Sequence, residues 1–261
     1  MKKKFVKVLA CYLALAMIIG IVPAFTPVAL AADTWNGTDT AAAYAGGSGT
    51  SANPYLIATG AQLAYLASNV NGGTSYGGTY FKLIDDINLD SKSWTSIGKD
   101  NGHAFSGFFE GNGKTISNLA SSNSTFGAVF SGVFGNVTGT VQNLNVGGSV
   151  SAHTTSFNSY AGGVVAYLNG GAVRNCSSSC TVVASGTPGY FVSLYSMAGG
   201  IVGSSSGTVQ NCFSTGSVQL PAHIMLIMQA ALREKPPEGR ITAIGRTVQL
   251  RAALAMDRGR T

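Results

Sequence analysis

Few side chains in this 261-residue chain could do chemistry, and the thiols come first. Beyond Cys11 the cysteines are Cys176, Cys180 and Cys212, and no His or acidic residue accompanies them, as a metal site would require. Cys176 and Cys212 each follow an Asn in the same short phrase. Such a pair could form a disulfide in an exported protein, or fill a core as small apolar side chains. We favour the core role and predict no metal or cofactor.

The acids and histidines form no recognisable catalytic set. Glycan cleavage by side chains needs two carboxylates at a defined separation, and the sequence places no two of its central acids that way. We interpret those acids as solvated surface residues. The three histidines are scattered and no H-E-x-x-H motif exists, which excludes zinc peptidase chemistry of that type. The residues concerned are Asp85, Asp86, Asp90, Asp100, Glu110, His103, His153 and His223.

One stretch resembles the start of a calcium loop. Asp86, Asn88 and Asp90 alternate as calcium ligands do, but Ser91 stands where the loop needs Gly and Ile97 where it needs a bidentate Glu. Ile87 and Leu89 alternate with the polar residues, as on a half-buried strand. We therefore predict a strand here and no metal site.

A five-residue sequence pattern, called the phrase below, occurs four times and indicates the elements that would position these residues. It reads Thr115-Ile116-Ser117-Asn118-Leu119, Thr140-Val141-Gln142-Asn143-Leu144, Ala172-Val173-Arg174-Asn175-Cys176 and Thr208-Val209-Gln210-Asn211-Cys212. The Asn residues are 25, 32 and 36 positions apart. Self-similarity at such spacings is typical of stacked repeat architectures, and short apolar runs between Gly residues favour strands over helices.

The phrase also predicts its own local structure. The apolar residues at its second and fifth positions would face opposite sides of an unbroken strand. A bend must therefore lie between them if both are to face one interior, and Asn tolerates the left-handed conformation of such a bend. We predict that Asn118, Asn143, Asn175 and Asn211 stack in one column of side-chain amides, with Cys176 and Cys212 pointing inward.

Two further stretches carry a resemblance to a known family. Gly199-Gly200-Ile201-Val202-Gly203, followed by Gly207-Thr208-Val209-Gln210-Asn211-Cys212, resembles the GLUG repeat of bacterial cell-surface proteins. The stretch from Phe105 to Leu119 resembles the region that usually precedes such repeats. The resemblance covers roughly residues 35–219 and implies an all-β, right-handed parallel β-helix. It says little about activity, because one fold serves many functions.

A single helix is expected before the repeats. Thr59 and Gln62 match a capping box, an apolar stripe follows from Leu63 to Val70, and Asn71-Gly72-Gly73 ends the pattern. A narrow stripe needs a surface to cover, and an open solenoid end offers one. We predict a cap region over residues 32–78 and repeats over 79–219.

The two ends of the chain differ from its centre. Residues 1–31 hold four Lys before a long apolar run and an Ala29-Leu30-Ala31 cleavage signal, which predicts an export signal cleaved near Ala31. A retained membrane anchor is the alternative. Residues 220–261 are rich in Arg and lack the repeat. They are either a C-terminal cap or, as we favour, the end of a frameshifted or truncated surface protein.

The distribution of charged residues along the chain restricts the classes of partner that we expect. Residues 32–219 carry five basic and seven acidic side chains, so the basicity of the whole chain lies in its ends. We therefore exclude nucleic acid as a partner and expect membrane contact only during export. The expected protein is an extracellular or cell-surface module, a stalk or adhesion segment without catalysis that contacts an unknown glycan or protein. The alternative is an accessory part of a polysaccharide lyase or hydrolase.

Overall fold

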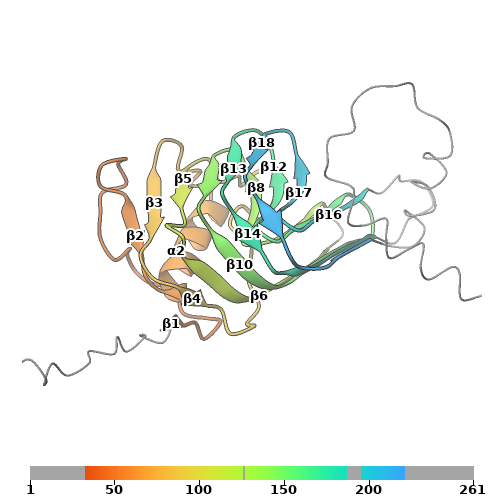
Figure 1. The fold of residues 1–261 in the computed structure, drawn as a ribbon, viewed down its shortest axis with the longest axis horizontal. Coiled ribbons are helices and arrows are strands. Elements are labelled where there is room, and N and C mark those ends of the chain that lie inside the picture. The colour runs from red at the N-terminus through yellow and green to blue at the C-terminus, as the bar shows by residue number, and fades with distance from the viewer. Residues whose placement is uncertain (1–32, 126, 187–194, 221–261) are drawn as a thin grey trace, which may run out of the picture. The chain divides into compact units, whose positions relative to one another are not determined.

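The computed structural model describes residues 33–125, 127–186 and 195–220 (Figure 1). The predicted export signal and nearly all of the Arg-rich tail lie outside these residues. The chain forms a parallel β-solenoid, and every ladder between named strands is parallel. This confirms the all-β, coiled architecture expected from the repeats.

Four sheets run along the solenoid, one on each side of the coil. The longest contains β1 (Asp33–Thr34), β4 (Ile87–Asn88), β6 (Thr115–Thr125), β10 (Asn145–Thr154), β14 (Ser177–Ser178), β15 (Thr181–Gly186), β19 (Phe213–Ser214) and β20 (Val218–Gln219). The six-stranded sheet contains β2 (Tyr55–Ile57), β3 (Tyr80–Leu83), β5 (Phe108–Glu110), β9 (Thr140–Gln142), β13 (Ala172–Arg174) and β18 (Thr208–Gln210).

Two three-stranded sheets complete the later coils. One contains β7 (Val129–Ser131), β11 (Ser159–Gly162) and β16 (Ser196–Gly199), and the other β8 (Phe134–Val137), β12 (Val165–Leu168) and β17 (Val202–Ser205). A full coil therefore passes through all four sheets in turn, as in β9, β10, β11 and β12. In these later coils a strand pairs with its counterpart 30 to 37 residues away, for example Val141 with Val173 and Val173 with Val209.

The core fills the inside of the coil. The inward residues of successive coils are aromatic near the N-terminal end, such as Phe81 and Phe109, and aliphatic later, such as Val141 and Val173. All four are buried. Burial of stacked apolar side chains holds each coil to its neighbours, because the hydrophobic effect scales with the apolar area removed from water.

Glycine at one turn of the repeat is required by close approach of successive coils. At Gly171, whose φ is +63°, an added Cβ would lie 1.9 Å from the carbonyl oxygen of Gly139. At Gly139 and Gly207 the corresponding distances, to Gly107 O and Gly170 O, are 2.1 and 2.3 Å. No side chain fits between coils at this corner, which explains why the phrase is preceded by Gly in all three late coils.

The predicted helix is present as α2 (Gly60–Asn71). Thr59 caps it by accepting a hydrogen bond from the Gln62 backbone N–H, and the Gln62 side chain reaches back to the N–H of Ala58. Its stripe of Leu63, Leu66, Ala67 and Val70 is buried in the same cluster as the coil interior. The helix connects β2 to β3, the first two strands of the six-stranded sheet (Figure 1), and its role as a cap stays a prediction.

The stack begins earlier in the sequence than predicted. Strands β1 and β2 lie inside the region 32–78 that we assigned to the cap, yet β1 pairs with β4 and β2 pairs with β3 in solenoid sheets. Their sequences lack the repeated phrase, which is why the pattern did not reveal them. The region 32–78 thus contributes strands to the solenoid sheets as well as α2.

Candidate functional site

The predicted Asn column exists for three of its four members. Asn143, Asn175 and Asn211 have φ of 55°, 51° and 54°, the left-handed bend expected between two inward residues. The Asn175 Nδ2 donates to Asn143 Oδ1 at 3.0 Å, and the Asn211 Nδ2 donates to Asn175 Oδ1 at 3.3 Å. At the lower end the Asn143 Nδ2 donates to both carboxylate oxygens of Glu110, each at 2.9 Å. The name Asn ladder is used below for Asn143, Asn175 and Asn211 together with Glu110.

Asn118 is not part of this ladder, so the prediction of one column of four is wrong. Asn118 lies in β6 of the long sheet, and its Nδ2 donates to Asn88 Oδ1 at 2.9 Å. In its coil the true counterpart of the phrase is β5, where Phe109 pairs with Val141 and Glu110 with Gln142. The step of 25 residues, shorter than the other two, was the available signal. The sequence of β5 does not match the phrase, because Phe109 stands at the position of Val141 and Gly111 at the position of Asn143.

The ladder runs along the outside of the bend rather than inside the coil. Asn143 is half-buried, and Asn175 and Asn211 are exposed. The two apolar positions of the phrase are buried in its first three occurrences, whereas in the fourth Val209 is exposed and Cys212 is half-buried. Val141, Val173 and Leu144 are fully buried, as is Ile116 at the bend of the long sheet. The expectation that both apolar positions face inward is therefore confirmed.

The inward thiols stack in adjacent coils. Cys176 is buried, Cys212 is partly exposed, and the Cys176 backbone N–H points at Cys212 Sγ at 3.5 Å. All three described cysteines are free thiols. Hydrogen bonding from Cys176 lowers the pKa of Cys212, whereas the same contact and burial raise the pKa of Cys176. Cys180 is buried, and burial raises its pKa too. Cys212 is thus the most nucleophilic thiol in the described part of the chain.

The acids proposed as surface residues serve turns and ladders. Asp86 Oδ1 accepts the Thr115 backbone N–H at 2.7 Å, and Asn88 Oδ1 accepts the N–H of Asp90 at 2.8 Å. Asp90 forms an ion pair with Lys92 at 3.4 Å. Asp86 and Asn88 thus accept backbone N–H groups, and Asp90 pairs with a lysine. Within the described residues no three His, Cys, Asp or Glu side chains are grouped so as to hold a metal ion.

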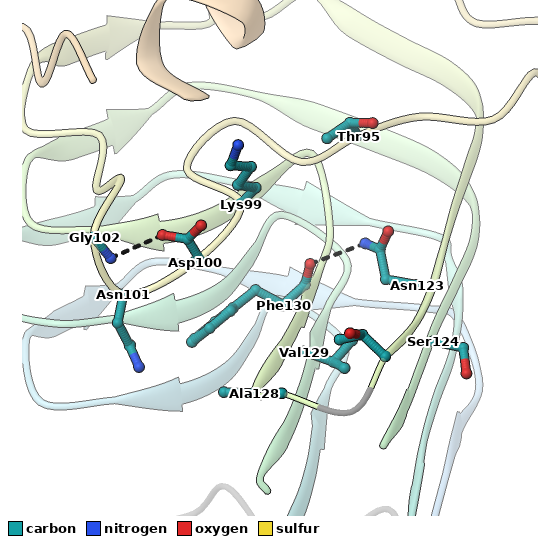
Figure 2. Close-up of a pocket in the computed structure, with 12 residues that line it drawn as sticks. Thr95, Lys99, Asp100, Asn101, Gly102, Asn123, Ser124, Ala128, Val129 and Phe130 are labelled. Carbon is teal, nitrogen blue, oxygen red and sulfur yellow. Dashed lines mark hydrogen bonds between the residues drawn. The ribbon is translucent and has the colours of Figure 1, made fainter. Parts of the chain in front are cut away.

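A cleft of about 570 Å³ lies beside the loop 99–102 (Figure 2). Asn71, the last residue of α2, holds this loop: its Oδ1 accepts the N–H groups of Gly98 and Lys99, at 3.0 and 2.8 Å. The opposite wall comes from the ends of β6 and β7, where the Asn123 Nδ2 donates to Phe130 O at 3.1 Å. The lining residues are Thr95, Lys99, Asp100, Asn101, Gly102, Asn123, Ser124, Thr125, Gly127, Ala128, Val129 and Phe130.

One acid–histidine pair lies at this cleft. Asp100 Oδ1 is 2.6 Å from His103 Nδ1 and accepts the Gly102 backbone N–H at 2.8 Å. Partial burial acts to raise the pKa of Asp100, but the hydrogen bonds from His103 and Gly102 outweigh it and hold that pKa below its usual range. Asp100 is therefore an anion at neutral pH, with Lys99 beside it in sequence. The sequence analysis considered Asp100 and His103 separately and did not predict that a tight turn brings them together.

Aromatic side chains gather on the outside of the coil at two places. Tyr80 and Phe108 stack on the six-stranded sheet, with ring centroids 4.5 Å apart and Phe108 39% exposed. Tyr160 stacks between Phe130 and Tyr167, with centroids 5.0 Å from each, next to the cleft. Tyr80, Phe108 and Tyr160 lie outside the buried core cluster. Trp94 is buried, and Tyr55 and Tyr76 pack against the core.

Comparison with known proteins gives partial matches. No model of a known protein family matches the chain. A halomucin from Haloquadratum walsbyi is 36% identical over 188 residues, 66% of this chain. A provisionally named Gly-rich membrane protein from Evansella cellulosilytica is 36% identical over 113 residues, 40% of this chain. The matched stretches span only 2% and 12% of those two proteins.

Among solved structures, a protein from Bacteroides ovatus provisionally named an immunoglobulin A1 protease is similar over part of its length. The match has a TM-score of 0.46 and 21% identity and covers 68% of this chain and 62% of the other. Of the helices that the structure describes, none has the length and apolar character needed to span a bilayer.

Proposed function

We propose that the chain is a repeat module of an exported surface protein, with coils of the GLUG type, that extends from the cell and contacts extracellular glycan or protein without catalysing a reaction. The observation that carries this proposal is the coil stack itself. Each coil is bonded to the next by parallel ladders, and the Asn ladder repeats from coil to coil on the outer surface. Such a stack is a spacer and a display surface.

The similar proteins support a surface role. One is named a halomucin and the other a Gly-rich membrane protein, and both are much longer than the matched stretch. Stacked repeats suit long proteins of this kind, because each coil contacts only its neighbours and the array can grow without a new core. Export through residues 1–31 and extracellular localisation are part of the proposal.

The contact surface that we propose for a glycan combines the cleft with the adjacent aromatic stack. Sugars are bound by aromatic faces together with polar side chains that fix the hydroxyl groups. Tyr160 and Tyr167 are half-buried and provide partly accessible ring surface, while Lys99, Asn101 and Asn123 provide polar groups on the neighbouring wall.

A second candidate function is polysaccharide cleavage at the same cleft. The Asp100–His103 pair, with Lys99 adjacent, is the observation that favours it, because an anionic acid and an imidazole can exchange a proton with a bound sugar. Against it stands the commitment of Asp100 to two hydrogen bonds within its own turn.

One experiment separates the two. The full chain and a Tyr160→Ala, Tyr167→Ala variant are incubated with a panel of neutral, acidic and amino-sugar polysaccharides. Retention on the polymer is measured by affinity electrophoresis, and new chain ends by a reducing-sugar assay. We expect retention that the double variant loses, with no new ends. New ends that depend on Asp100 would favour the enzyme, and absence of retention on every polymer would overturn glycan contact.

A further inference from the structure

The outer face of the six-stranded sheet carries an aromatic pair. Strands β3 and β5 lie side by side in this sheet (Figure 1), and along each of them buried residues alternate with accessible ones. Tyr80 and Phe108 occupy accessible positions and are paired in register. Their rings are 4.5 Å apart with only 6° between the planes, and Phe108 is 39% exposed. The pair therefore presents a flat apolar surface to solvent.

Polar side chains border the aromatic pair. Lys82, Glu110 and Gln142 form the neighbouring column of accessible residues, in register with one another. The Gln142 Nε2 donates to Glu110 Oε2 at 2.8 Å, which fixes the amide and leaves Gln142 Oε1 without a partner among the described residues. Within the same part of the chain Lys82 forms no ion pair. We call these three residues, with Tyr80 and Phe108, the sheet face.

The charge on the sheet face restricts the class of ligand. Both carboxylate oxygens of Glu110 accept from Asn143, and Oε1 also accepts the Asn112 backbone N–H, as an ionised carboxylate does. Glu110 follows Phe108 by two positions on one strand, a distance of about 6.6 Å. An acidic group on a ligand over the Phe108 ring is therefore repelled by Glu110, whereas uncharged hydroxyl groups are not.

We propose that the sheet face binds one uncharged pyranose unit of an extracellular polysaccharide. The apolar side of the sugar ring lies on Phe108 and Tyr80. Gln142 Oε1 accepts from one ring hydroxyl, and the Lys82 ammonium donates to another. This site is separate from the cleft, which lies against the ends of β6 and β7, and it rests on the proposed function only in taking a glycan as ligand. On a long polymer the two sites reinforce each other, because linked sites bind more tightly than either alone.

The test places a fluorophore on the sheet face of the full chain. Trp35 and Trp94 are buried, so the emission of a Phe108→Trp variant, measured against the unmodified chain, reports this surface. The variant is titrated with the neutral hexasaccharides of glucose, mannose and xylose and with hexagalacturonate. We expect a saturable change with at least one neutral sugar. Hexagalacturonate should bind about tenfold more weakly, because like charges about 6.6 Å apart repel each other near a protein surface.

A second arm separates the sheet face from the cleft. The Phe108→Trp titration is repeated with Tyr160→Ala and Tyr167→Ala added, and again with Gln142→Ala added, after circular dichroism has shown that each variant is folded. The cleft substitutions should leave the emission change unaltered, and Gln142→Ala should weaken binding about fivefold through the lost hydrogen bond.

Three results would overturn the proposal: no emission change with any neutral sugar, tighter binding of hexagalacturonate, or an emission change that the cleft substitutions abolish. The failure of this site and that of the proposed function are distinguishable. If the Phe108→Trp emission does not respond while the chain is still retained on a polymer through Tyr160 and Tyr167, the sheet face is not a sugar site and glycan contact at the cleft stands.

Discussion

Replacing Asn143 by Leu tests the energetics of the Asn ladder. Asn143 contributes in three ways: it adopts φ of 55°, it donates to the Glu110 carboxylate through two contacts of 2.9 Å, and it accepts from Asn175 at 3.0 Å. A Leu in the left-handed region costs about 1 kcal/mol. A hydrogen bond to a charged group is worth ~1.5–3 kcal/mol, reduced here because Asn143 is half-buried and water can replace it. The exposed contact to Asn175 adds little.

We therefore expect Asn143→Leu to lower the free energy of unfolding by about 2–3 kcal/mol in urea denaturation of the full chain. Asn143→Gly, which accepts the bend but loses the side chain, should cost about 1 kcal/mol less than Leu. Asn211→Leu is the matched control: it has the same φ but only one described contact, at 3.3 Å, and should cost about 1 kcal/mol. If Asn143→Leu costs no more than Asn211→Leu, the ladder contributes nothing and the reasoning is wrong.

Three further predictions concern the turn, the thiols and the cleft. Gly171→Ala should destabilise the protein far more than Gly170→Ala in thermal unfolding, because a Cβ at Gly171 meets a carbonyl at 1.9 Å and one at Gly170 meets nothing within 4 Å; equal losses would refute the close-approach argument. Cys212 should be alkylated by iodoacetamide at pH 7 faster than Cys180, as mass spectrometry would show, because its pKa is lowered while burial raises that of Cys180; the reverse order would contradict the assignment. The Asp100 carboxyl should titrate below about 3.9 by NMR, so that its stabilising contribution is present above that pH and is lost as pH falls through the lower folded value; a midpoint at or above 3.9 would be inconsistent with its hydrogen bonds.

The local rules of the repeat were readable from the sequence, and the assignment of strands to sheets was not. Apolar residues on either side of Asn143 require a bend there, and Asn is among the few residues that accept it, so both its conformation and the inward direction of its neighbours followed. Asn118 satisfies the same local rule, which is why it was placed in the wrong column. Only the pairing of Glu110 with Gln142 reveals which strand lies beneath β9, and pairing is a tertiary property.

The cleft was less predictable than the fold for a similar reason. Asp100 and His103 meet through a turn held by Asn71, which is 27 and 28 residues from the two amides that it binds. No spacing in the sequence announces such a contact. Tyr160 stacks with Phe130 and Tyr167, which come from strands of two different sheets, and their meeting could not be predicted from the sequence.

Surface exposure in living cells tests the central proposal most directly. The full chain is expressed in a bacterial host, intact cells are treated briefly with trypsin, and released peptides and the N-terminus of the cell-associated chain are identified by mass spectrometry. The proposal predicts a mature N-terminus at Ala32 and release of peptides from this chain without release of cytoplasmic proteins. A chain that keeps residues 1–31 and becomes accessible to trypsin only after lysis would contradict an exported surface module.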